Sequence, residues 1–164
     1  MRYNKIEKNS IANGTGIRVV LWCQGCSLHC KNCHNPQTWD FNGGNMFDVK
    51  AIQTICRELE KPYVSGCTLS GGHPLEPGNI EVCTALCRYL KRRFPDKTIW
   101  LYTGWNWEEI SSLEIFKYID VVVDGPYIEE QKDITLKWRG SRNQRVIDVQ
   151  KSLTNKMIVL LDDC

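Results

Sequence analysis

The sequence predicts an α/β fold, a curved and open sheet of mostly parallel strands in a single domain over residues 1–164. Short β-branched apolar runs alternate with segments of about 10–15 residues that have helical periodicity, which is the pattern of βαβ units. The length of 164 residues suits one domain. It is too short for a complete eightfold βα barrel, which needs about 200 residues or more, so the sheet is expected to stay open.

Six apolar runs are expected to form strands. Ile17–Cys23 reads IRVVLWC, and this β-branched, apolar composition is typical of a strand that is buried on both faces. A weaker run follows over residues 64–69. The remaining runs cover residues 98–103, 119–124, 145–149 and 157–161.

Three segments with apolar residues every three or four positions are expected to form helices, over residues 47–60, 79–93 and 106–116. Asp48 is placed to cap the first helix and Pro62 to end it. Asn106 begins the third helix with Glu109 three positions later, which is the spacing of a capping box.

The composition limits the partners of the chain. Lys and Arg total 21 and Asp and Glu total 19, so the net charge is +2. A balance this small excludes a dominant electrostatic attraction to nucleic acid or to an anionic membrane. Residues 1–16 lack the apolar core of a secretory signal, and no run approaches the roughly 18 apolar residues of a membrane span. We therefore expect a cytoplasmic protein with no nucleic-acid and no membrane partner.

Nine cysteines are unusual for a chain of this length. An odd count excludes complete internal pairing, and clustered cysteines in a reducing compartment are typically metal ligands or catalytic groups. Four of the nine lie within eleven residues, at Cys23, Cys26, Cys30 and Cys33. This cluster predicts a metal site in the loop that follows the first buried strand.

The C-x3-C-x2-C spacing of Cys26, Cys30 and Cys33 lets a short loop wrap three thiolates around one metal centre. Thiolates are soft ligands that suit iron–sulfur clusters or zinc. A cubane cluster has four irons, so three cysteines leave one iron open to a reacting ligand. A fourth ligand at Cys23 would close the site and make it structural, but Cys23 ends the strand and is expected to pack in the core.

Other chemistry-bearing segments also follow predicted strands. They are Ser70 to Pro74 (SGGHP), Tyr102 to Gly104 (YTG) and Val123 to Gly125 (VDG). In an open α/β sheet, function gathers at the carboxyl ends of the strands, so these segments and the cysteine loop are expected to form one site. Two adjacent glycines at a strand end permit a positive φ and a close approach of the backbone to a ligand.

The cysteine spacing resembles that of the radical S-adenosylmethionine (SAM) superfamily, which implies an open, partial (βα) barrel. The resemblance implies that Cys26, Cys30 and Cys33 hold a 4Fe-4S cluster, and that the fourth iron takes the amino and carboxylate groups of SAM. Main-chain groups from Asn32 through Cys33 to His34 are then expected to contact the adenine.

The glycine pair resembles the GGEP-type element of the same superfamily, which contacts the methionine amino group of SAM. Gly71 and Gly72 are therefore expected to bind SAM through their backbone. His73 is expected to lie in the same cofactor site, although it stands where the element usually has an acidic residue, and a neutral imidazole offers one acceptor nitrogen.

Further segments resemble the family of anaerobic ribonucleoside-triphosphate reductase-activating proteins, in the same order along the chain. They are Asn13 to Arg18 (NGTGIR), Thr38-Trp39, Ile99 to Gly104 (IWLYTG), Val123 to Gly125 (VDG) and Arg139 to Arg145 (RGSRNQR). The resemblance implies reductive cleavage of SAM to a 5′-deoxyadenosyl radical, which takes hydrogen from a glycine of the large reductase subunit. It also implies a flavodoxin- or ferredoxin-like electron donor, and no catalytic acid or base from this chain.

Alternatives remain at this point. One is a pyruvate formate-lyase activator or another radical SAM enzyme, since Cys33-His34-Asn35-Pro36 is similar to formate-lyase activators. A different class is a non-catalytic zinc or iron–sulfur binding module. Arg139, Arg142 and Arg145 fit either a solvated basic loop or a contact with a partner. Four tryptophans are expected to pack in the core rather than stack on a cofactor, and they are Trp39, Trp100, Trp105 and Trp107.

Overall fold

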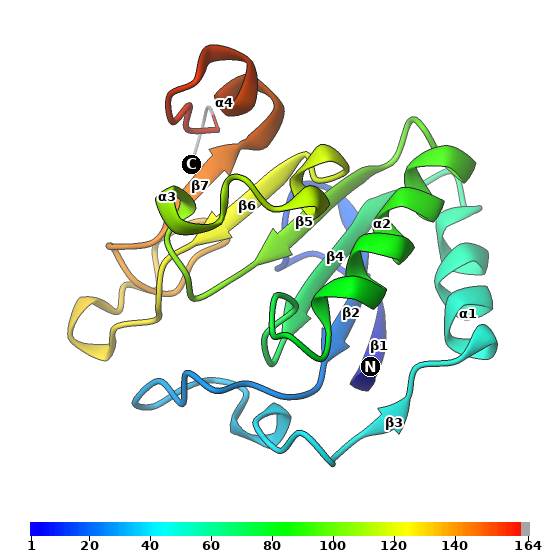
Figure 1. The fold of residues 1–164 in the computed structure, drawn as a ribbon, viewed down its shortest axis with the longest axis horizontal. Helices are drawn as coiled ribbons and strands as arrows, with labels where there is room; N and C mark the ends of the chain where they lie inside the picture. The colour runs from blue at the N-terminus through cyan, green and yellow to red at the C-terminus, as the bar shows by residue number, and fades with distance from the viewer. Residues whose placement is uncertain (162–164) are drawn as a thin grey trace.

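The computed structural model describes residues 1–161, which form one open seven-stranded sheet in the order β3-β1-β2-β4-β5-β6-β7 (Figure 1). Strands β2, β4, β5 and β6 are parallel to one another, whereas β1, β3 and β7 are antiparallel to their neighbours. The α/β class is therefore confirmed, and the sheet does not close into a barrel. The strands are β1 (Arg2–Ser10), β2 (Ile17–Cys23), β3 (Asn45–Met46), β4 (Val64–Gly71), β5 (Thr98–Tyr102), β6 (Val121–Asp124) and β7 (Arg145–Asp148).

Each α-helix comes after a strand along the chain. They are α1 (Val49–Leu59), α2 (Ile80–Arg93), α3 (Trp107–Ile110) and α4 (Val149–Asn155), with 3-10 turns η1 (Pro36–Thr38), η2 (Glu114–Lys117) and η3 (Glu129–Gln131). The Asp48 carboxylate accepts a hydrogen bond from the Ala51 N–H at 2.9 Å, so the predicted cap of α1 is confirmed. In α3, Glu109 accepts from the Asn106 N–H at 3.1 Å, as a capping box requires.

Several predicted boundaries are wrong. The helix expected over residues 106–116 is broken into α3 and η2, because Leu113 between them is extended (ψ 139°). The strand expected over residues 157–161 does not form, and Leu160 makes only an isolated bridge to Ile147. The prediction also omitted β1, β3 and α4. Strand β1 has the polar sequence RYNKIEKNS and pairs with β2 near the edge of the sheet, where apolar residues are not required.

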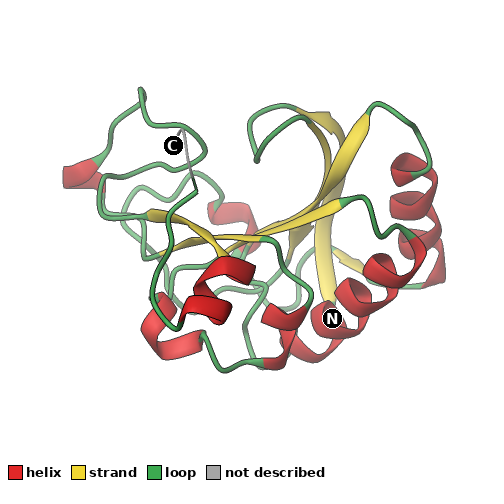
Figure 2. Cartoon of the chain, turned by 90° about the horizontal axis from the view of Figure 1, so that it is seen from above, coloured by secondary structure: helices red, strands yellow, loops and turns green. Residues whose placement is uncertain are grey.

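The main core lies between the sheet and its helices. Figure 2 shows the sheet close to edge-on, with α1 and α2 on one face. Apolar residues of β2, β4, β5 and β6 contribute to the core on that face, whereas on the opposite face Trp100, Val123 and Val146 form a smaller cluster with Trp138. The central strands are therefore buried on both sides. No helix within residues 1–161 is long and apolar enough to cross a membrane.

A buried arginine fixes the loop that precedes β2. Arg18 is fully buried, and its guanidinium donates to Thr68 Oγ1 at 2.6 Å and to the Thr15 carbonyl at 3.1 Å. Thr68 Oγ1 in turn donates to the Asn13 carbonyl at 2.8 Å. Burial lowers the pKa of Arg18 to about 10, so the side chain stays charged at neutral pH. This network holds Asn13 over the second face of the sheet, where it lines the cavity of the candidate site.

Candidate functional site

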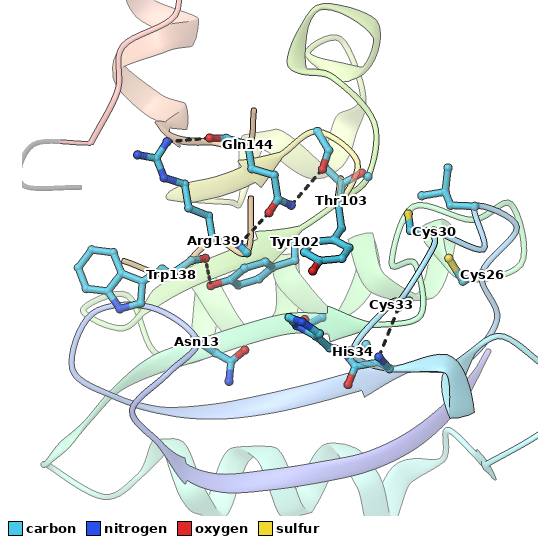
Figure 3. A pocket seen from close by; sticks show the side chains of 18 of the residues that line it. Asn13, Cys26, Cys30, Cys33, His34, Tyr102, Thr103, Trp138, Arg139 and Gln144 are labelled. Carbon is cyan, nitrogen blue, oxygen red and sulfur yellow. Dashed lines mark hydrogen bonds between the residues drawn. The ribbon is translucent and has the colours of Figure 1, made fainter. Parts of the chain in front are cut away.

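The predicted segments converge on one cavity of about 600 Å³ at the carboxyl edge of the parallel strands (Figure 3). The cysteine loop forms one end, and the residues that follow β4, β5 and β6 form the wall between the two ends. The residues from these segments are Cys26, Cys30, Cys33, His34, Ser70, Gly71, Gly72, Tyr102, Thr103, Gly104 and Gly125. The expectation that these segments meet at one edge of the sheet is therefore confirmed.

The three predicted ligand cysteines line the same cavity but differ in burial. Cys26 is buried with 8% of its surface exposed, whereas Cys30 and Cys33 are half-buried, and all three thiols are free. The Cys33 sulfur accepts from the Asn35 N–H at 3.4 Å. Within residues 1–161, no three His, Cys, Asp or Glu side chains are gathered closely enough to hold a metal ion. The ligand role of the three cysteines thus remains a prediction.

Cys23 packs in the core, as expected. Its side chain is fully buried, and its sulfur lies 4.0 Å from the sulfur of Cys83 on α2. The contact with Cys83 and burial both raise the pKa of Cys23 well above its ordinary value, so the thiol stays protonated. A buried, protonated thiol outside the cavity behaves as a small apolar side chain.

Burial also affects Cys26. It raises the pKa of the Cys26 thiol, while the N–H groups of Leu28 and His29 act in the opposite direction by hydrogen bonding to the sulfur. Deprotonation of this thiol in the free protein is therefore disfavoured, and a bound metal would supply the charge that favours the thiolate.

The glycine pair is required by the cysteine loop as well as by any ligand. Gly71 has φ +100°, as predicted, and a Cβ there would lie 2.8 Å from the Cys23 carbonyl oxygen. A Cβ on Gly72 would lie 2.6 Å from the carbonyl oxygen of Gly25. Neither position has room for a side chain, so the end of β4 packs directly on the backbone from which the cysteine loop begins.

The structure places the side chain of His73 away from the cavity. It is 1% exposed, with Nε2 2.7 Å from Thr103 Oγ1 and Nδ1 3.3 Å from Glu76 Oε1. Burial lowers the pKa of His73, although Glu76 acts in the opposite direction. Because Thr103 Oγ1 already accepts from the Trp105 N–H, the neutral tautomer that donates from Nδ1 to Glu76 and accepts at Nε2 satisfies every group. Both ring nitrogens are then occupied.

The three residues predicted to contact adenine, Asn32, Cys33 and His34, differ in position. His34 lines the cavity and packs against Tyr127, with ring centroids 5.0 Å apart. Asn32 is exposed with φ +55°, and it is not among the lining residues within the described chain. Contact of Asn32, Cys33 and His34 with SAM remains a prediction.

The sequence analysis missed the end of the cavity opposite the cysteines, where Asn13, Trp138 and Arg139 lie (Figure 3). Trp138 has φ +58°, which is strained for a bulky residue. Tyr102 Oη donates to its carbonyl at 2.8 Å. The RGSRNQR segment was identified from the sequence, but its position at this end depends on how the chain folds after β6. Trp39, expected in the core, also lines the cavity and packs on His29.

The three arginines of that segment have different environments. Arg139 lines the cavity, and its Nη1 donates to the Gln144 carbonyl at 2.7 Å, while its Nε is buried with no partner among the described residues. Arg142 is exposed and pairs with Asp133 at 3.1 Å. Arg145 pairs with the buried Asp124 at 2.5 Å. Only Arg139 among the three is placed to meet a ligand in the cavity.

The site fits an iron–sulfur cluster in its donor chemistry. Three free thiols from one short loop lie at one end of a cavity of about 600 Å³, and soft thiolates are the ligands that such clusters take. Cys23 is fully buried in the core and does not line the cavity, so three thiols of the clustered cysteines face it.

Comparison with known proteins agrees with this geometry. Residues 12–147 match the family model of the 4Fe-4S single cluster domain. An anaerobic ribonucleoside-triphosphate reductase-activating protein of Enterobacteria phage T4 is 43% identical over 148 residues, which are 89% of this chain and 93% of the relative. This chain belongs to the anaerobic ribonucleoside-triphosphate reductase-activating protein family.

Bacterial members of this activating-protein family match over a similar length. The Haemophilus influenzae protein is 40% identical over 148 residues, covering 88% of this chain and 96% of the relative. The Escherichia coli K12 protein is 35% identical over 150 residues, covering 89% and 97%. Family membership therefore extends over almost the whole chain, including the cysteine loop, the glycine pair and the RGSRNQR segment.

Proposed function

We propose that this protein activates an anaerobic ribonucleoside-triphosphate reductase by generating its glycyl radical. The single observation that carries the proposal is that three free cysteine thiols and a glycine pair share one cavity, in a chain of this activating-protein family. The activity is that of a radical SAM oxidoreductase, with a 4Fe-4S cluster and SAM as cofactors.

The residues divide the work between the two cofactors. Cys26, Cys30 and Cys33 would hold the cluster and leave one iron for the amino and carboxylate groups of SAM. Gly71 and Gly72 expose backbone at the cavity wall and would bind the methionine part. Main-chain groups from Asn32 through Cys33 to His34 would contact the adenine. The ring nitrogens of His73 both have protein partners, so His73 would contribute to the SAM site through its backbone and not through its side chain.

When bound, the cluster supplies the electron that cleaves SAM to methionine and a 5′-deoxyadenosyl radical. The chain itself has to bind SAM, orient it and exclude competing reactions.

The open sheet supports a polypeptide substrate. Residues 1–161 form a single sheet with free edges rather than a closed barrel. We infer that it is the open, partial (βα) barrel of a single radical SAM domain, with room at the cavity mouth for a loop of the large reductase subunit. A flavodoxin- or ferredoxin-like donor would reduce the cluster, and the whole reaction would take place in the cytoplasm.

Anaerobic reconstitution tests the proposal. The purified chain is reconstituted with iron and sulfide, reduced with dithionite and given SAM, and 5′-deoxyadenosine is measured. The large reductase subunit is then added, and its glycyl radical is measured by electron paramagnetic resonance. Zinc without iron would overturn the proposal in favour of a structural module. A cluster that does not cleave SAM would favour an electron carrier, and activation of pyruvate formate-lyase instead would change the substrate.

A further inference from the structure

The segment that begins at Gly72 holds the first half of the cysteine loop through a series of hydrogen bonds. Residues 72–79 follow β4 and lie along residues 23–27, which lead from β2 into the loop. The bonds are Gly72 N–H to the Cys23 carbonyl (2.8 Å), His73 N–H to the Gly25 carbonyl (2.8 Å), Asn79 Nδ2 to the Gln24 carbonyl (2.9 Å), and Ser27 N–H and Oγ to Glu76 Oε1 (2.8 and 2.6 Å). We call residues 72–79 the brace.

Glu76 is the charged member of the brace. It is 4% exposed, and one of its oxygens accepts from both donors of Ser27 and from His73. Burial by itself would raise the pKa of Glu76, but the hydrogen bonds from Ser27 and His73 lower it below its ordinary value, so the carboxylate is ionised at neutral pH. Bonds to a charged acceptor are about twice as strong as those between neutral groups.

His73 holds Glu76 in place. The imidazole lies between Glu76 Oε1 and Thr103 Oγ1, and it packs edge-on against Trp105 with ring centroids 4.4 Å apart. Thr103 immediately follows β5, so the ends of β4 and β5 are connected through this ring to the cysteine loop. The carboxylate of Glu76, three residues after His73, faces the cysteine loop and does not line the cavity.

The brace reaches one of the three predicted ligands. The Cys26 N–H donates to the Trp39 carbonyl at 3.2 Å, and the flanking Gly25 and Ser27 are held by the brace. The part of the loop that carries Cys30 and Cys33 has an internal bond from the Cys33 N–H to the Cys30 carbonyl at 3.1 Å. It also contains left-handed residues at 29 and 32 (φ 45° and 55°). Cys26 is therefore fixed from both sides, while the other two cysteines lie on a segment with fewer constraints.

We infer that Glu76 is a positioning residue for Cys26. Its carboxylate fixes the backbone directly after the first ligand, so that Cys26 is already in place when Cys30 and Cys33 close around the cluster. This inference rests on the proposed function. It assigns to Glu76 a role towards the cysteine loop and not towards the amino group of SAM.

The test measures how firmly the chain holds its cluster, without SAM or reductase. Wild type, Glu76→Ala, Glu76→Gln and Glu130→Ala are reconstituted anaerobically, and iron transfer to a ferrous chelator is followed. Glu76→Ala is expected to lose iron about 10–100-fold faster, as is typical when a residue that orients a metal ligand is removed. Glu76→Gln keeps a carbonyl that accepts from Ser27, so it should restore most of the difference. A purely structural loss would not be rescued in this way.

Glu130→Ala is the matched control. Glu130 pairs with Lys31 of the same loop at 2.8 Å, but both side chains are exposed, so its removal should change the rate of iron loss less than about twofold, because exposed pairs contribute little. Equal rates for Glu76→Ala and Glu130→Ala would overturn the role of Glu76. A Glu76→Gln variant that loses iron as fast as Glu76→Ala would overturn it too.

Two further arms keep the test decisive. If Glu76→Ala does not fold as apoprotein, Ser27→Ala removes one of the two bonds from Ser27 to the carboxylate and should speed iron loss about tenfold, by analogy with a bond to a charged group. A wild-type rate for Ser27→Ala would then overturn the inference. A wild-type chain that takes up no cluster would overturn the proposed function together with the inference, whereas failure of the Glu76 variants alone leaves the proposed function standing.

Discussion

Gly71 and Gly72 serve two structural purposes at the end of β4. They must leave backbone free at the cavity wall, and they must let β4 pack on the backbone of Cys23 and Gly25. The second requirement is not visible in the sequence, because the two segments are more than 40 residues apart. A motif that resembles a ligand-binding element is thus also a packing element.

Gly71→Ala should destabilise the protein by about 2 kcal/mol, because it combines a positive φ with a Cβ too close to the Cys23 backbone. Denaturant unfolding of the apoprotein measures this. Gly78→Ala is the matched control, because the added Cβ meets nothing within 4 Å among the described residues. It should change the free energy of unfolding by less than about 0.5 kcal/mol. Equal effects would contradict the packing argument.

The four clustered cysteines should separate into two groups. Alanine at Cys26, Cys30 or Cys33 should abolish cluster reconstitution and SAM cleavage, because each removes a thiolate ligand. Cys23→Ala should keep its iron and lose about 1 kcal/mol of stability, as a small deletion in the core. Iron analysis after reconstitution and denaturant unfolding measure both effects. Loss of iron from Cys23→Ala would require a four-ligand site.

At the level of elements, an ion-pair network connects α3 to β6 and β7. Arg145 Nη2 contacts the buried Asp124 at 2.5 Å and Glu108 Oε2 at 2.8 Å, and Asp124 also accepts from the Trp107 N–H at 2.8 Å. This network fixes the one-turn helix α3, which is too short to be stable alone. Arg145→Ala would leave Asp124 buried without its cation and should destabilise the protein by about 3 kcal/mol, as measured by denaturant unfolding.

The same network predicts a pH dependence. Hydrogen bonds from Arg145 lower the pKa of Glu108 to about 2, from an unfolded value of 4.5. A lowered carboxyl pKa stabilises the folded state above pH 4.5, and that contribution is lost as the pH falls towards 2. Glu108 is largely exposed, so screening keeps the effect below about 1 kcal/mol. Unfolding at pH 6 and pH 3 should show it in wild type and not in Glu108→Gln, and an equal loss in both would contradict the assignment.

For the molecule as a whole, the cavity joins two ends of different character. The cysteines lie at one end, and Trp138, Arg139 and Asn13 lie at the other, on loops that cover the second face of the sheet (Figure 3). An open sheet with a cavity at its edge gives a protein loop access to a site that binds small cofactors. Contact of the reductase with the end opposite the cysteines is therefore expected to affect how efficiently SAM cleavage leads to a glycyl radical.

Arg139→Glu should lower the yield of glycyl radical per SAM cleaved by about tenfold, as expected when a charged contact at a protein interface is reversed. Arg142→Glu is the matched control, because Arg142 lies three residues away, is exposed and pairs with Asp133. It should stay within about twofold of wild type. The measurement is the ratio of glycyl radical to 5′-deoxyadenosine. An unchanged ratio for Arg139→Glu would show that Arg139 makes no contact with the reductase that matters for activation.

The local sequence pattern was sufficient to predict much of this structure. The buried parallel strands, the caps of α1 and α3, the core position of Cys23 and the convergence of the strand ends all follow from periodicity and side-chain chemistry, which act over a few residues. The polar edge strand β1, the short helix α4 and the failure of residues 157–161 to form a strand do not, because pairing at an edge depends on neighbours distant in the chain. The brace around Cys26 and the separation of Arg139 from Arg142 and Arg145 have the same origin. Each is a contact between segments that only folding brings together, and a single sequence carries no local signal for it.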